Sequence, residues 1–240
     1  MINIVKKHTP TTAVKVIDGT ASSAMVDLSS HRDTLTANSV AMSSGVTPPF
    51  GATSMYFTAP NCYVGYTTKR ITGTYTTPFT GEVFFNPSTT LNTTNAYVFA
   101  GEADSITAPA NGNWFAAFYQ GRLRIHRYTG SSTTCYRIAL GDGTITFTAG
   151  TWYHVFFQVN SDTTHTIGYG CPSTGYTGTI LTGTPTTLSQ APNVANYGLG
   201  PGTGWGDAVL NSYMQAYRLT DGIARYPTSG TYKIPIYPGM

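Results

Sequence analysis

The chain has 240 residues, of which 10% are charged and 40% are hydrophobic, and its formal net charge is +3. Ordinary soluble proteins have about 25% charged residues, and here threonine, glycine and serine take their place. The 17 tyrosines and 11 phenylalanines argue against disorder, and no apolar run reaches the ~20 residues of a spanning helix. We therefore expect a folded domain with no membrane segment, and the weak charge gives no reason to expect nucleic acid.

Short stretches rich in β-branched and aromatic residues recur along the chain, separated by glycine, proline and asparagine turns. Gln120-Gly121, for example, is a two-residue hairpin signal. This spacing predicts an all-β sandwich or barrel. We expect strands at residues 14–17, 54–57, 62–66, 81–86, 97–100, 114–119, 122–127, 135–140, 145–147, 151–159, 165–169, 197–199 and 212–220.

No internal repeat or change of composition divides the chain, so we expect one domain over residues 21–240, preceded by an N-terminal arm over residues 1–20. The proline-rich residues 221–240 are expected to lie across the outside of this domain. Three cysteines without CxxC spacing predict free, buried thiols. The first seven residues lack the apolar stretch of a secretory signal, so we expect synthesis in the cytoplasm.

Four segments resemble the phage LamG-like domains of the concanavalin A-like lectin/glucanase superfamily. Residues 216–226 (AYRLTDGIARY), followed by a proline-rich tail, are similar to the closing segment of that family. Residues 149–155 (AGTWYHV), 49–57 (PFGATSMYF) and 81–85 (GEVFF) are similar to three of its other strands, in the same order along the chain.

The resemblance implies a jelly-roll sandwich of two antiparallel sheets. It also implies a protein of a bacteriophage virion, made in the host cytoplasm, with capsid or tail proteins as partners and cell-surface polysaccharide as a further partner. A homo-oligomer is expected, because accessory proteins of a particle follow the symmetry of their site.

The carboxylates of the family pattern are partly missing. Neutral residues 168–172 (GYGCP) and 213–215 (YMQ) replace acidic positions, and Thr107 stands where the glucanase signature that begins at Glu102 and Asp104 has its acid. A retaining glycosidase needs two carboxyl groups about 5 Å apart. We therefore predict no catalysis and an exposed acidic loop, with calcium bound by Glu102, Asp104 and Asn111 or Asn113 as the alternative; no other cofactor is expected.

Arg122, Arg124 and His126 alternate with apolar residues in one predicted strand. Alternation places their side chains on one face of the sheet. This basic stripe predicts either a solvated face or a contact with an acidic glycan or a neighbouring subunit.

Trp205 lies in a glycine-rich loop, where no core requires an aromatic side chain. An aromatic ring beside a carboxylate and amides is typical of a sugar site, because the ring stacks on the C–H face and polar groups bond the hydroxyls. We name a candidate glycan site at Trp205, Asp207, Tyr176, Asn196 and Tyr197. A subunit contact and packing over a sheet edge remain alternatives for Trp205.

Three functions follow from these observations. The first is a non-catalytic capsid decoration or accessory protein, attached through residues 1–20 and with a role in glycan adhesion. The second is a tail or fibre adhesin that binds host-surface glycans. The third, a glycoside hydrolase, lacks its carboxylate set.

Overall fold

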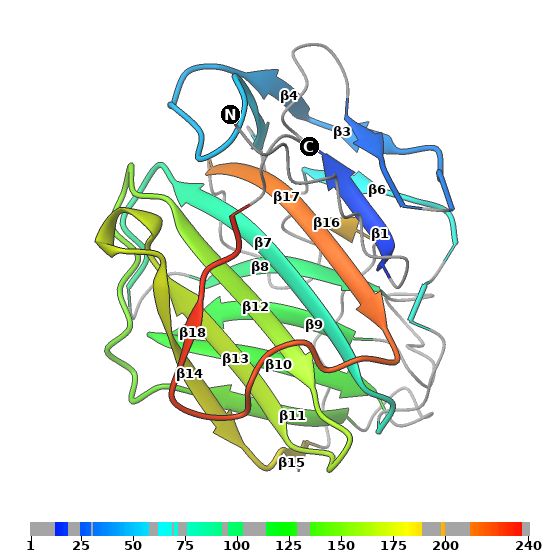
Figure 1. Ribbon diagram of the computed structural model, residues 1–240, viewed down its shortest axis with the longest axis vertical. Coiled ribbons are helices and arrows are strands. Elements are labelled where there is room, and N and C mark those ends of the chain that lie inside the picture. Colours follow the sequence, from blue (N-terminus) through cyan, green and yellow to red (C-terminus); the bar gives the residue numbers. More distant parts are fainter. Residues whose placement is uncertain are drawn as a thin grey trace, which may run out of the picture.

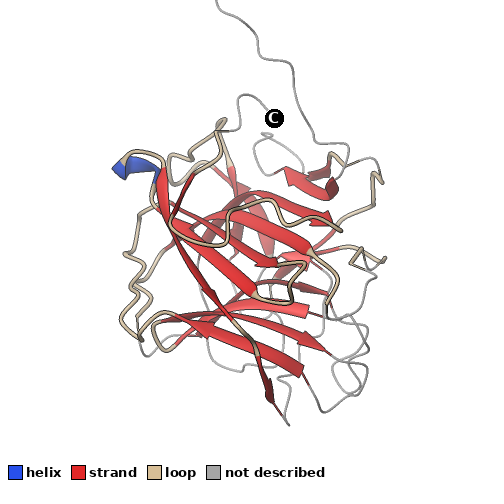
Figure 2. Cartoon of the chain, turned by 60° about the horizontal axis from the view of Figure 1, so that its bottom comes forward, coloured by secondary structure: helices blue, strands red, loops and turns tan. Residues whose placement is uncertain are grey.

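The computed structural model describes residues 13–18, 25–29, 31–57, 62–68, 70–71, 76–92, 96–102, 114–128, 135–188, 198–199 and 212–236. These residues form strands and one short 3-10 helix, η1 (Pro172–Thr174). The strands stack in two layers (Figure 2). Across these ranges, no helix is long and apolar enough to cross a membrane.

Sheet A forms the first layer, and all of its described pairings are antiparallel. β5 (Ser54–Phe57) and β1 (Ala13–Asp18) share one edge of β17 (Ser212–Asp221), on the side away from β7 (Phe79–Pro87): β5 pairs with the first residues of β17 and β1 with its later ones. In spatial order the sheet holds β18 (Thr231–Lys233), β14 (Thr177–Gly183), β13 (His165–Gly170), β12 (Tyr153–Val159), β7 (Phe79–Pro87), β17 (Ser212–Asp221), β1 (Ala13–Asp18) and β2 (Val26–Asp27), with β5 (Ser54–Phe57) beside β17 and β4 (Val40–Ser43) beside β5.

Sheet B forms the second layer and is also antiparallel. Ser39, whose φ is 54°, lies between β3 (Thr36–Asn38) of sheet B and β4 of sheet A. The chain therefore passes from one layer to the other at this residue. The order is β15 (Thr186–Leu188), β11 (Cys135–Leu140), β10 (Arg122–Tyr128), β9 (Trp114–Tyr119), β8 (Ala96–Glu102), β16 (Gly198–Leu199), β6 (Tyr63–Gly65) and β3 (Thr36–Asn38).

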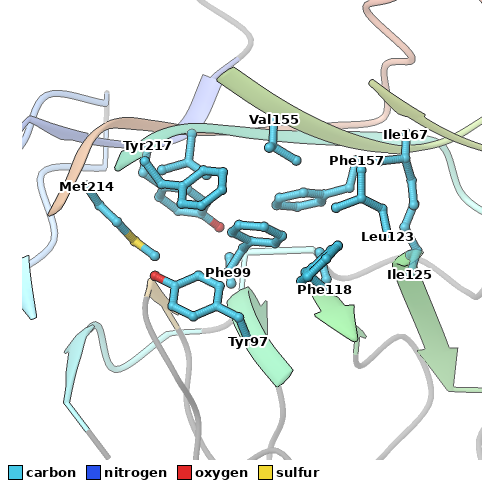
Figure 3. Packing of buried hydrophobic residues seen from close by; sticks show 14 of the residues in the cluster. Tyr97, Phe99, Phe118, Leu123, Ile125, Val155, Phe157, Ile167, Met214 and Tyr217 are labelled. Carbon is cyan, nitrogen blue, oxygen red and sulfur yellow. The ribbon is translucent and has the colours of Figure 1, made fainter. Parts of the chain in front are cut away.

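The main hydrophobic core lies between the sheets. Phe85 and Phe157 of sheet A meet Phe99 and Phe118 of sheet B, and each is at most 1% exposed. Figure 3 shows aromatic side chains from the two layers pointing toward one another. Edge-to-face contacts such as Phe85–Phe99, with ring centroids 5.0 Å or less apart, add to the area that they bury. The predicted all-β sandwich of two antiparallel sheets is confirmed.

The other face of sheet A is covered by residues 222–236, which we call the C-terminal strap. Figure 1 shows it crossing β7 and β12 on its way to β18. It is held by backbone and side-chain bonds: Thr80 Oγ1 donates to the Ile223 carbonyl (2.9 Å), and the Gln158 amide pairs with both the N–H and the C=O of Tyr226 (2.9 and 3.0 Å). The predicted position of this segment across the outside is thereby confirmed as far as Ile236.

A buried carboxylate, Glu82 of β7, lies beneath the strap. It accepts hydrogen bonds from Arg218 of β17 and from the hydroxyl of Tyr226, and His154 Nε2 lies 3.2 Å from it. Burial opposes the charged form of Glu82, but Arg218, His154 and Arg225 outweigh it and hold its pKa well below its ordinary range. Burial also lowers the pKa of His154, so the neutral ring donates to Glu82 and accepts from Tyr232 Oη at 2.8 Å.

The structure corrects some local predictions. Residues 145–147 form no strand, because Phe147 makes only an isolated bridge to Leu91. Ala13–Asp18 pair with β17, so the second half of the expected arm is an integral strand of sheet A. Cys62 is free and buried as predicted, whereas Cys171 is free and half-buried.

Replacing Glu82 with glutamine removes the charge that Arg218 faces in the interior. Breaking a buried ion pair costs about 3–5 kcal/mol, so we expect E82Q to lower the free energy of unfolding by that amount in urea denaturation. The exposed carboxylate of Asp162, which bonds only its own turn, provides the control D162N. Equal stabilities of the two variants would contradict this account of the network.

Acid is expected to destabilise the protein through His165, which is buried on β13. Burial and the nearby Arg127 lower its pKa from 6.5 to about 4. As the pH falls, His165 is protonated near pH 6.5 in the unfolded chain but only near pH 4 in the folded chain. The free energy of unfolding therefore decreases by about 3 kcal/mol between these two pH values. Denaturation at several pH values should show a smaller slope for H165N than for the wild type. An unchanged slope in H165N would contradict the assignment.

Candidate functional site

The outward face of sheet B carries the basic residues that the sequence indicated. Leu123 and Ile125 of β10 point into the core, so the alternating Arg122, Arg124 and His126 point away from it. The predicted alternation is therefore present. Their exposure differs, however: Arg122 is exposed, Arg124 is 8% exposed and His126 is fully buried.

His126 belongs to the packing of this face. Its ring stacks on that of Phe115, the residue opposite it on β9, with centroids 4.1 Å apart and an interplanar angle of 13°. Burial, together with Arg137 and Arg124, lowers its pKa well below the ordinary value. His126 therefore remains neutral at pH 7 and adds no charge to the basic stripe.

Arg137 adds a third guanidinium that sequence reasoning missed. It lies on β11 directly opposite His126 and is half-buried. The signal was present in the sequence, because the predicted strand 135–140 follows the strand of Arg122 and Arg124 across a short connection. Only the register, however, places Arg137 on the same face as these two residues. We call Tyr119, Gln120, Arg122, Arg124 and Arg137 the basic face.

The hairpin between β9 and β10 positions two neutral members of this face. Gln120 and Gly121 both have positive φ, 54° and 66°, as a tight two-residue hairpin requires. The turn brings Gln120 Oε1 within 3.3 Å of Arg124 NH2 and places the Tyr119 ring 4.8 Å from the Arg124 guanidinium carbon. The Arg124 side chain is thus oriented by a hydrogen bond and a cation–π contact.

The charges of the basic face repel one another. Burial, together with Arg137 and Arg122, lowers the pKa of Arg124 to about 10. Asp142 is a nearby carboxylate, and its pKa is lowered by bonds from Thr144 and, to a smaller extent, by Arg122. Arg122 and Arg137 form no salt bridge with any described residue.

Glu102 lies at the end of β8 and points into the interior, so the exposed acidic loop that we predicted there is wrong for this residue. Its carboxylate accepts four hydrogen bonds, from the hydroxyl of Tyr66 (2.7 Å), the backbone N–H groups of Arg70 and Ile71 (2.8 Å each) and the Trp114 indole (3.2 Å). Because both oxygens are taken, neither calcium ligation nor catalysis fits this carboxylate. Among the described residues, no group of three or more His, Cys, Asp or Glu side chains could hold a metal.

Most of the predicted glycan site lies outside the described residues: Trp205, Asp207, Asn196 and Tyr197 are not among them, and neither is Asp104 of the calcium alternative. These residues stay predictions. Tyr176 follows η1 at the edge of sheet A and is 37% exposed, with a φ of 56°. Its carbonyl accepts the N–H of Ile234, which ties the turn to the C-terminal strap.

The fold is similar to that of bacterial toxin binding domains. The binding domain of Paraclostridial Mosquitocidal Protein 1 matches with a TM-score of 0.53 and 12% identity, over 89% of this chain and 50% of that one. The botulinum neurotoxin serotype C1 binding domain matches with a TM-score of 0.53 and 7% identity, over 87% and 48%. The receptor binding domain of botulinum neurotoxin type G gives 0.50 and 8%, over 87% and 47%.

These similarities establish a shared sandwich fold, because the identities are far too low to carry more. The chain spans about half the length of each of these structures. No protein-family model matches the sequence, and no curated protein matches it either.

Glutamine at position 102 should destabilise the fold and leave any response to calcium unchanged. The glutamine amide places N–H groups where the carboxylate accepted hydrogen bonds from buried donors. This mismatch lowers the free energy of unfolding by about 3 kcal/mol. We expect this loss for E102Q in urea denaturation, and no shift of the melting temperature when calcium is added to either protein. A calcium-dependent rise in the wild type that E102Q abolishes would contradict the structural role.

Proposed function

We propose that this chain is a non-catalytic accessory protein of a virion that displays a polysaccharide-binding sandwich on the particle surface. The resemblance of four segments to phage LamG-like domains supports the virion location. The similarity of the fold to binding domains of toxins supports a binding role. The engagement of Glu102 by four interior donors supports a role without hydrolysis.

One observation carries the binding role: basic and aromatic side chains reach the surface of sheet B at the β9–β10 hairpin and on β11. The C-terminal strap lies over the outward face of sheet A and forms hydrogen bonds with Thr80, Gln158 and Glu82 there. The outward face of sheet B presents Arg122 to solvent, with Arg137 and Tyr119 half-buried beside it. Arginine and aromatic side chains are the residues that binding surfaces favour. Sheet B is therefore the layer that meets a partner.

Attachment to the particle is assigned to residues 1–12. Because β1 pairs with β17 inside sheet A, residues 13–18 belong to the sandwich and are not available for attachment. Residues 1–12 precede this strand. Copies of the chain would then follow the symmetry of the shell as a homo-oligomer.

Immunogold labelling of intact particles tests the location. We expect label spread over the head, in keeping with a decoration protein. Label confined to the tail would replace this proposal with that of a tail adhesin, and particles without label would overturn the virion location altogether.

Deleting residues 1–12 should abolish attachment to particles in a co-sedimentation assay while leaving the melting temperature unchanged. Deleting residues 1–18 removes β1 as well, so we expect it to lower the melting temperature, because β17 loses its hydrogen-bonded neighbour. A protein without residues 1–12 that still binds particles would contradict the assignment of the arm.

A further inference from the structure

We infer that two exposed turns at one end of sheet B bind a pair of neighbouring sugar hydroxyl groups, with Asp142 as the acceptor and Arg122 as the donor. This inference rests on the proposed polysaccharide-binding function, and it names the site and the chemical group that the site recognises. The ligand is a polysaccharide that carries free vicinal hydroxyl groups along its chain.

The two turns are packed against each other. The first, Gln120-Gly121, joins β9 to β10, and the second, residues 141–143, follows β11. The carbonyl of Gly121 accepts the N–H of Ile145 at 3.2 Å, so a backbone hydrogen bond links the first turn to the end of the second. A Cβ atom at Gly121 would lie 2.1 Å from the carbonyl oxygen of Gly143, a contact that only glycine avoids. The turns therefore give fixed backbone positions to the residues that they carry.

The polar side chains of these turns are accessible to a ligand, since Gln120, Arg122, Asp142 and Thr144 are all exposed. Arg122 begins β10, and its Nε lies 3.8 Å from the Cβ position of Gly143. The side chain of Arg122 thus reaches the second turn, which also carries Asp142.

The carboxylate of Asp142 uses one of its oxygens within the turn. Its Oδ1 accepts hydrogen bonds from the backbone N–H of Thr144, at 3.0 Å, and from the Thr144 hydroxyl. Its Oδ2 takes part in neither bond. The bonds from Thr144, together with Arg122, lower the pKa of Asp142, so the group is an anion at neutral pH.

Arg122 and Asp142 lie near each other without pairing. Arg122 contributes to the lowered pKa of Asp142, yet it forms no salt bridge with any described residue. Two neighbouring hydroxyl groups can bridge such a pair, because one donates its hydrogen to the carboxylate and the other accepts from the guanidinium. Each of these bonds involves an ion, which makes it roughly twice as strong as a bond between neutral groups.

The charges of the pair favour hydroxyl groups over anions. One positive and one negative group cancel, and an anion bound at Arg122 would be repelled by Asp142. Tyr119, which is half-buried, lies directly opposite Arg122 on β9 and offers the exposed part of its ring to the C–H groups of a sugar. A subunit interface is a poorer fit, because stable interfaces have an apolar centre from which charge is depleted.

Isothermal titration with dextran, alginate and laminarin tests the inference. Dextran and alginate both carry free vicinal hydroxyl groups along the chain, and alginate adds a carboxylate to each sugar. In laminarin the glycosidic linkage occupies the hydroxyl between the two remaining ring hydroxyls, so no vicinal pair is free within the chain. We expect dextran and alginate to bind and laminarin not to bind, with dextran binding insensitive to salt.

R122Q and D142N each remove one of the two ions. Each should weaken dextran binding about tenfold, in line with the loss of one charge-assisted hydrogen bond. Asp162 provides the matched control, because its carboxylate makes the same two bonds, to the N–H and the hydroxyl of Thr164, in a turn of sheet A where no described arginine affects its pKa. D162N should therefore leave dextran binding unchanged.

Unchanged dextran binding by the double variant R122Q/D142N, with its melting temperature preserved, would overturn the inference. Equal binding of laminarin would overturn it too, as would binding of alginate alone that salt abolishes, and both results would leave the proposed polysaccharide-binding function intact. Absence of binding to all of these polymers would count against the proposed function itself.

Discussion

The carboxylate of Glu82, buried beneath the C-terminal strap, joins parts of the chain that lie far apart in sequence. Arg218 reaches it from β17, His154 from β12 and Tyr226 from the strap. A buried carboxylate lowers the free energy of unfolding unless each of its partners is present. The network therefore favours the one arrangement of the strap over the sheet that brings all of these partners together. The segments 81–85, 149–155 and 216–226, which resemble the LamG-like pattern, supply all four of these residues. These three segments, distant in sequence, therefore meet in one buried network.

Closure of sheet A determines where the protein can act. Tyr226 and Tyr232 of the strap pack against Phe156 and His154, and Phe50 packs against Phe84, so these three side chains of the outward face are buried. Sheet B has a different outward face, in which His126 and Phe115 pack together while Arg122 remains exposed. A core on one side and charged side chains on the other is the ordinary condition of an antiparallel sheet. In this molecule the outward face of sheet B carries the exposed Arg122 and the half-buried Arg137.

Sequence patterns predicted the strands of the core well, because alternation and turn residues are local signals. Residues 54–57, 114–119 and 135–140 match the observed strands, and Tyr153, Val155 and Phe157 share the predicted face. The patterns could not show that His154 and Phe156 on the opposite face are also buried, since the strap that covers them is distant in sequence. The same limit applies to the site, because strand register places Arg137 on the same face as Arg122 and Arg124. Glu102 points into the interior, where the Trp114 indole and the Tyr66 hydroxyl donate hydrogen bonds to it.

We propose that sheet B, and not sheet A, carries the binding face. Hydrogen–deuterium exchange, measured by mass spectrometry with and without alginate, tests it most directly. The account predicts that alginate slows exchange in β9, β10 and the hairpin that joins them, and leaves β14 and β18 unchanged. Slower exchange confined to β14, β18 and the C-terminal strap would contradict it.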